Sequence, residues 1–231
     1  YKGLIGARTT ISTGKSTVAE YADEARRAKI DFIVFLEDHK SMTPEKNAEL
    51  AKQCRAVSDD TFQAIPGYTI EDEFGNQWFF GGFAASYPGQ WDLSEDGKVL
   101  VGHYGKPERL ARIPETYQPK TSTLGITICN LTGGEHQYQA LTGGWNFKKA
   151  SMPPWDFRDF NGSAIFTYDE NGNLIDNIWD AYFLIQNNGN RIEPYVITLM
   201  DNAEQVAIHA KGYLNYIFAD NLTTAAKELG S

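Results

Sequence analysis

Four polar residues stand directly after apolar segments of the sequence, where their side chains could do chemistry. Arg8 follows the short apolar stretch 4–5, Asp38 and His39 follow the apolar run 31–36, and Asp201 follows the apolar run 195–199. Carboxylates and imidazole can bind cations or transfer protons, whereas a guanidinium keeps its proton and binds anions. In α/β proteins the carboxyl ends of the strands carry the site. We therefore expect Arg8 to point at whatever this protein binds.

The segments that must position these residues alternate between strand and helix patterns. Thr17 and Glu20 have the spacing of a capping box, and Thr43 precedes Pro44 at the start of a second helical stretch. The run 31–36 is continuously apolar, as expected of a parallel strand buried on both faces. The pattern predicts parallel strands joined by right-handed crossovers. The first third then holds strands at 4–5, 31–36 and 62–65, the last closed by Pro66 and Gly67, and helices at 17–28 and 43–57.

The remaining two thirds contain further strand and helix signals around long loops. A turn is predicted at 169–172, and residues 85–122 hold many turn formers. Strands are predicted at 77–80, 124–131, 163–168, 195–199 and 213–219, and helices at 176–187, 203–210 and 223–229. The sequence contains no internal repeat, so we expect a single α/β domain over residues 1–231.

The composition excludes some classes of function. The 231 residues are 42% apolar and carry a net charge of −9, which is typical of a globular protein and argues against a nucleic-acid partner. No apolar run approaches the roughly 18 residues of a membrane span. Cys54 and Cys129 lie in apolar contexts that predict buried thiols.

The ends of the sequence suggest a piece of a longer or processed chain. The chain starts on Tyr1 rather than Met, only a few residues before the first predicted strand, and it stops at Ser231 just after the last predicted helix. We therefore expect other domains of the same longer chain as partners. The compartment stays unknown, with an extracytoplasmic one among the alternatives.

The order of these segments resembles the PHP family (polymerase and histidinol phosphatase), whose members are metal-dependent hydrolases on a distorted seven-stranded β/α barrel. The likeness extends over nearly the whole chain and is greatest to the branch that contains carbaryl-type esterases. The family opens with Asp-Leu-His-x-His-Thr, where residues 4–9 here read Leu-Ile-Gly-Ala-Arg-Thr. Its Thr-Asp-His motif is matched by Asp38 and His39, and the stretch 212–220 resembles the family's tail.

Most metal ligands that the resemblance implies are substituted in this sequence. A family carboxylate in Pro-Gly-x-Glu corresponds to Thr69, unless Glu71 substitutes for it, and the family's Asp-x-His begins at Asp201. A centre of two or three ions needs about four to six His and carboxylate ligands. Four histidines implied by the family are replaced here by Gly6, Arg8, Asn130 and Ala203.

Arg8 would repel a cation in the position that the family gives to metal ions. The repulsion is about 4 kcal/mol per unit of charge at roughly 4 Å and an effective dielectric constant of about 20. We therefore expect Arg8 to replace the metal electrostatically, with Asp38 and Asp201 as its carboxylate partners.

Two further stretches contain binding signals. Residues 143–161 include five aromatic side chains, among them Trp145 and Trp155, which could stack on sugar rings or instead cover the mouth of the barrel. Residues 14–17 read Gly-Lys-Ser-Thr, like the end of a phosphate-binding loop, but Thr9 stands where that loop needs glycine. A loop leading into a helix is the simpler interpretation, although its N–H groups could accept an anion.

The sequence favours a PHP-like pseudoenzyme without a metal cofactor, acting as a binding or assembly module. Its pocket would be centred on Arg8 and take an anionic or carbohydrate ligand, with Asp38, His39, Asn130, Asp201, Trp145 and Trp155 as further contact residues. The alternative is a hydrolase of phosphoesters, esters or amides that holds Zn or Mn through Asp38, His39, Glu71 and Asp201, with His39 as ligand or base. A purely structural domain is a third reading.

Overall fold

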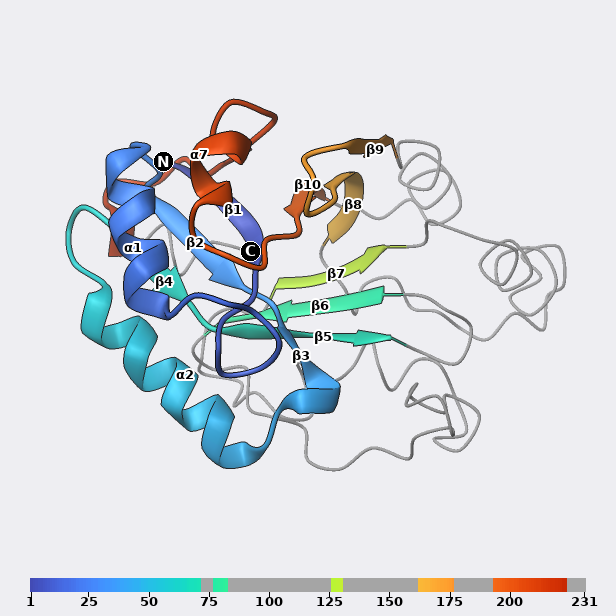
Figure 1. Cartoon of the computed structure of the whole chain (residues 1–231). Coiled ribbons are helices and arrows are strands. Elements are labelled where there is room, and N and C mark those ends of the chain that lie inside the picture. The colour runs from blue at the N-terminus through green and yellow to red at the C-terminus, as the bar shows by residue number, and fades with distance from the viewer. Residues whose placement is uncertain (72–76, 83–125, 131–161, 177–192, 224–231) are drawn as a thin grey trace, which may run out of the picture.

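In the part of the chain that the structure describes, the helices lie together on one side and pack against a group of strands there (Figure 1). The structure is a computed structural model, and it describes residues 1–71, 77–82, 126–130, 162–176 and 193–223. The mixed α/β class expected from the sequence is confirmed. The strands form two sheets, one with four strands and one with seven.

The first sheet has the order β11-β1-β2-β4 and contains the three strands predicted in the first third of the chain. β1, β2 and β4 are parallel, and β11 is antiparallel to β1. Two helices connect the parallel strands, as the alternating pattern predicted. The bounds are β1 (Lys2–Ala7), α1 (Val18–Arg27), β2 (Phe32–Phe35), α2 (Pro44–Val57), β4 (Gln63–Ile65) and β11 (Asn215–Tyr216).

The second sheet has the order β10-β8-β7-β6-β5-β3, with β9 paired to β8. β6 is antiparallel to both β5 and β7, β9 is antiparallel to β8, and the other pairs are parallel. The bounds are β3 (Glu37–Asp38), β5 (Gly67–Glu71), β6 (Gln77–Gly81), β7 (Ile126–Asn130), β8 (Gly162–Tyr168), β9 (Leu174–Asp176) and β10 (Glu193–Thr198).

The two sheets are linked by chain segments that pass from one into the other. Only Leu36 separates β2 from β3, and only Pro66 separates β4 from β5. Pro66 has no N–H for the ladder, so the strand is interrupted there but continues in the next sheet. The predicted end of the strand before Pro66 is therefore confirmed, whereas the new strand that begins at Gly67 was not predicted. The two sheets also meet at the end of β1, where an isolated parallel bridge joins Ala7 to Met200, which follows β10.

Alternating residues of the central strands face two different apolar clusters. The first, which we call the helix-side core, contains Leu4 and Ile33 with buried side chains of α1, α2 and α7 (Gln205–His209). The second, the strand-side core, contains Ile5 and Val34 with Phe79 of β6 and Ile197 of β10. The strand-side core thus joins strands of both sheets, and β1 and β2 are covered on both faces.

The helix boundaries follow the capping signals of the sequence. Thr17 and Glu20 form both hydrogen bonds of the capping box at α1, and Thr43 caps α2, whose first residue is Pro44. Cys54 is buried, as predicted, whereas the side chain of Cys129 lies outside the description.

One predicted element differs from the structure. The expected strand 213–219 is reduced to the two residues of β11, which pair with β1. β9 was not predicted and ends at Asp176, where the helix 176–187 was expected to begin, and residues 177–187 lie outside the described residues. Among the described residues, no helix has the length and apolar character needed to cross a membrane.

Candidate functional site

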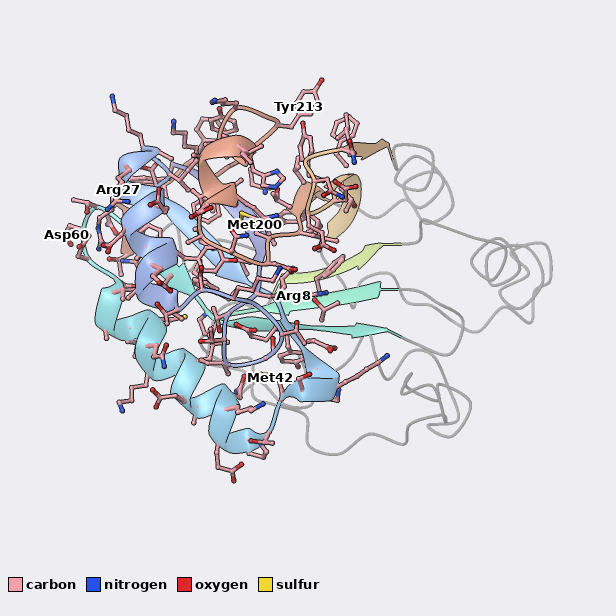
Figure 2. The ribbon with its side chains drawn as sticks, viewed as in Figure 1. Arg8, Arg27, Met42, Asp60, Met200 and Tyr213 are labelled. Atoms are coloured by element: carbon pink, nitrogen blue, oxygen red, sulfur yellow. The ribbon has the colours of Figure 1, made fainter. Side chains whose placement is uncertain are left out.

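Arg8 is the first residue beyond β1, and its main chain is fixed on both sides. Its N–H donates to the Met200 carbonyl at 2.9 Å, and the neighbouring Ala7 carbonyl accepts from Leu36 N at 2.7 Å. Figure 2 labels Arg8 and Met200. Because Ala7 belongs to the helix-side core, strand alternation directs Arg8 toward the strand-side face. Its Nε is buried and has no hydrogen-bond partner among the described residues.

The loop after Arg8 is compact. The Thr9 carbonyl accepts from Ser12 N at 3.1 Å and from Gly14 N at 2.9 Å. A Cβ at Gly14 would lie 2.1 Å from the Arg8 carbonyl oxygen, so only glycine lets the chain fold back this closely. The loop therefore packs against the main chain of Arg8.

The stretch that resembles a phosphate-binding loop uses its own polar groups internally. Lys15 N donates to the Asp201 carbonyl at 2.6 Å, and Ser16 Oγ accepts from Ala203 N at 3.0 Å. Thr17 N donates to the Glu20 carboxylate at 2.7 Å. These groups hold a loop and a helix start, which confirms the simpler interpretation.

Glu37 is a functional candidate that the sequence reasoning missed. Its side chain is 0% exposed, and its carboxylate accepts from Thr9 N at 3.0 and 3.1 Å, from Thr9 Oγ1 at 2.7 Å and from Ser12 Oγ. Burial raises the pKa of Glu37, while the bonds from Ser12 and Thr9 and the positive charge of Arg8 oppose that rise. The available signal was a charged residue directly after an apolar run and before the motif Asp38–His39.

Asp38 and His39 lie at the end of β3, where the sequence placed them. The Asp38 carboxylate accepts from Lys40 N at 3.3 Å and from Ser41 Oγ at 3.5 Å, so it caps the short helix η1 (His39–Ser41). The His39 side chain is only 4% exposed, and its ring centre lies 6.1 Å from that of Tyr68. Asp38 pairs in register with Thr69, which pairs with Phe79 of the strand-side core. Asp38 therefore belongs to the same face as Arg8.

Asp201 lies close to Glu170, a residue in the turn after β8 that the sequence reasoning did not select. Gln205 holds the two segments together, because its Oε1 accepts from Asp201 N at 2.7 Å and its Nε2 donates to the Glu170 carbonyl. A hydrogen bond between the two carboxyl groups and the charge of Asp201 raise the pKa of Glu170, while Lys15 and Arg8 oppose the rise. Lys15 Nζ lies 3.9 Å from Asp201 Oδ2.

Among the residues that the structure describes, Arg8 forms no ion pair with the carboxylates expected as its partners. Within the described ranges, the ion pairs are Lys15 with Asp201, Arg26 with Asp59, Arg27 with Glu24 and Lys52 with Glu49. Arg8 instead acts at longer range on Glu37 and Glu170. Asp38 and Asp201, the carboxylate partners expected for Arg8, make other contacts in the described residues: Asp38 caps η1 and Asp201 lies beside Lys15.

Two positions where the family resemblance implies histidine are buried against the main chain or the core. Gly6 has a φ of +136°, and a Cβ there would lie 2.1 Å from the Thr198 carbonyl oxygen. The main chains of β1 and β10 have closed together at this point. Ala203 is 4% exposed and packs in the helix-side core, so a side chain there faces the helices.

The remaining predicted site residues are placed only by their strands or not at all. Glu71 ends β5 and Asn130 ends β7, and both pair with Gln77 of β6. The carboxyl ends of β5 and β7 thus lie at the same end of the second sheet's strands. Trp145 and Trp155 lie outside the described residues.

Three positions where the family resemblance implies metal-binding histidines are occupied by Gly6, Arg8 and Ala203. The described ranges contain no group of three or more His, Cys, Asp or Glu side chains that could hold an ion. Gly6 leaves no space for an imidazole, Ala203 packs in the helix-side core, and Arg8 adds a permanent positive charge.

Comparisons with known proteins show a shared fold. No protein-family model matches the chain, and no match was found among curated proteins. Among solved structures, the chain is similar to a two-domain protein from Bacteroides vulgatus that contains a predicted PHP-like metal-dependent phosphoesterase. The TM-score is 0.57 at 12% sequence identity, and the match covers 99% of this chain but 63% of the other protein. The chain therefore shares its α/β fold with a PHP-like protein and spans less than two thirds of that protein's length.

Proposed function

We propose that this chain is a PHP-like domain with a degenerate metal centre, which binds an anionic ligand at Arg8. In this role it would be a binding or assembly module beside other domains of a longer chain. The structural likeness supports the PHP-like part, since the similar protein is described as having two domains and a PHP-like phosphoesterase.

The strand connections favour the distorted seven-stranded barrel of that family. Passing through the bends at Leu36 and Pro66, the strand positions run in the order β10, β1, β2 with β3, β4 with β5, β6, β7 and β8, which makes seven. β8 pairs with β10, and the bridge between Ala7 and Met200 brings the end of β10 to β1. The shared strand-side core would fill the interior.

The state of Arg8 is the observation that carries the binding role. Its Nε is buried without a partner in the described part of the chain, at the strand end where α/β proteins place their ligands. A buried donor left unsatisfied costs about 1–3 kcal/mol. A phosphate, sulfate or carboxylate group would remove this cost and match the guanidinium in charge and geometry.

Binding of inorganic sulfate, measured by calorimetry, tests the proposal. Arg8→Gln removes the charge and should abolish binding, whereas Arg8→Lys keeps the charge but loses the planar set of donors and should weaken it about tenfold. Arg27→Gln is the matched control, because Arg27 is 70% exposed and pairs with Glu24 on α1, away from the site (Figure 2). Equal sulfate affinity in the wild type and Arg8→Gln would contradict the proposal.

The same preparations distinguish the hydrolase alternative. Metal analysis and assays with a generic phosphodiester and an aryl ester would be run before and after chelation. Near-stoichiometric Zn or Mn, with activity lost in Asp38→Ala, would favour the reduced site of Asp38, His39, Glu71 and Asp201. A chain that binds neither sulfate nor metal would favour the purely structural domain.

A further inference from the structure

Glu37 belongs to β3, and its buried carboxylate lies beside the segment that follows β1 and begins with Arg8. It accepts from three donor groups, namely Thr9 N, Thr9 Oγ1 and Ser12 Oγ, and both of its oxygens are used. The side chain is 0% exposed, so an external ligand has no direct access to it. A fully satisfied, buried carboxylate fixes the groups that donate to it.

Thr9 transmits this constraint to Arg8 and to the loop. Thr9 is the next residue after Arg8, is itself 0% exposed, and its Oγ1 also accepts from Ile11 N at 3.2 Å. Its carbonyl accepts from Ser12 N and Gly14 N, and Gly14 packs on the Arg8 carbonyl. Loss of the carboxylate would therefore release the main chain on one side of Arg8, while Met200 still holds the other side.

Ser12 extends the same constraint to Asp38. Its hydroxyl donates to Glu37 and accepts from Asp38 N at 3.3 Å. One buried carboxylate thus sets the main-chain positions of Arg8 and Asp38, the two charged residues assigned to the strand-side face.

We infer that Glu37 is a positioning residue of the Arg8 site: through Thr9 and Ser12 it holds the main chain that presents Arg8, so affinity at Arg8 depends on a carboxylate that the ligand never touches. The ligand-affinity part rests on the proposed function, whereas the dependence of Arg8 on Glu37 does not. A displacement of about 1 Å is enough to weaken a preorganised site by two orders of magnitude.

Two measurements on the same variants test this inference, sulfate affinity by calorimetry and the Arg8 Nε–H signal by NMR. Glu37→Gln keeps the side-chain shape but removes the charge and one acceptor oxygen. Thr9→Val keeps the volume but removes the hydroxyl, and Thr9→Ser restores it. Glu37→Gln and Thr9→Val should each weaken sulfate binding about tenfold or more and shift the Arg8 signal, and Thr9→Ser should rescue both to within about twofold of wild type.

Asp59→Asn supplies the matched control, because Asp59 accepts the corresponding N–H and hydroxyl of Thr61, remote from Arg8. It should leave both readouts unchanged. Unaltered affinity and an unaltered Arg8 signal in Glu37→Gln and Thr9→Val would overturn the inference. If the wild-type chain binds no sulfate but the Arg8 signal shifts in Glu37→Gln, the proposed function is contradicted and the positioning role of Glu37 is supported.

Discussion

Two carboxylates at opposite ends of the strands accept nearly the same hydrogen bonds, but their pKa values are shifted in opposite directions. Glu37 accepts the N–H and hydroxyl of Thr9, and Asp59 accepts the N–H and hydroxyl of Thr61 at 2.7 and 2.6 Å. Glu37 is 0% exposed, whereas the Asp59 side chain is 51% exposed and pairs with Arg26 at 2.7 Å. Burial raises the pKa of Glu37, and the bonds from Thr61 hold the pKa of Asp59 well below its usual range.

The difference shows that burial, rather than the number of hydrogen-bond donors, decides whether the pKa of such a carboxylate is raised or lowered. Asp59 organises the short connection between α2 and β4, where water can replace any bond that is lost. Glu37 lies where no water replaces a lost partner, so its donors are held firmly. A buried carboxylate suits the carboxyl ends of the strands, where a site needs a rigid main chain.

Truncation of the two acids should show the largest contrast. Glu37→Ala leaves the Thr9 and Ser12 donors unsatisfied and opens a cavity, so it should lower the free energy of unfolding by about 3 kcal/mol. Asp59→Ala should cost about 1 kcal/mol, since water solvates the freed groups. Urea denaturation of both variants measures this, and equal losses would break the comparison.

The paired threonines should give the next largest contrast. Thr9→Val removes a donor from a buried carboxylate and should lower the free energy of unfolding by about 2 kcal/mol. Thr61→Val removes the equivalent donor from an exposed carboxylate and should cost about 0.5 kcal/mol. Thermal and urea unfolding would show the difference, which a larger loss in Thr61→Val would contradict.

The pH dependence of stability should have opposite signs at the two sites. The folded pKa of Glu37 is raised, so its contribution to stability is greatest below its unfolded value, near 4.5, and falls as pH rises toward the folded pKa. Glu37→Gln should remove that fall. The folded pKa of Asp59 is lowered, so its contribution is present above about 3.8 and lost in stronger acid, and Asp59→Asn should remove that loss. Stability curves between about pH 2 and 8 that retain both slopes in the variants would refute this assignment.

The smallest expected effect concerns salt. Arg26→Gln breaks the exposed pair with Asp59 and should cost about 0.5 kcal/mol at low ionic strength and close to nothing at about 1 M salt. The loss caused by Thr9→Val should persist in salt, because the Glu37 network is made of buried hydrogen bonds. A salt-sensitive Thr9→Val loss would show that solvent reaches that network.

Local features of the chain were predictable because their causes lie within a few residues. The capping box of Thr17 and Glu20, the Pro44 helix start and the apolar run before Glu37 all formed the elements expected of them. The position of Arg8 at a strand end also followed from the sequence. The lengths of other strands were less predictable, because pairing with neighbouring strands decided them: β5 and β9 were not predicted, and the expected strand 213–219 is reduced to β11.

The sequence by itself determined where the two capped helices begin, and that Arg8 stands directly after an apolar strand. Only the tertiary structure decided which groups surround it. Glu37 meets Thr9 across 28 residues, and Gly6 meets the Thr198 carbonyl of β10, far along the chain. Such contacts leave no periodicity in the sequence, because they depend on how separate strands pack rather than on neighbouring residues. Burial follows from the same packing, and it gives Glu37 and Asp59 their different roles.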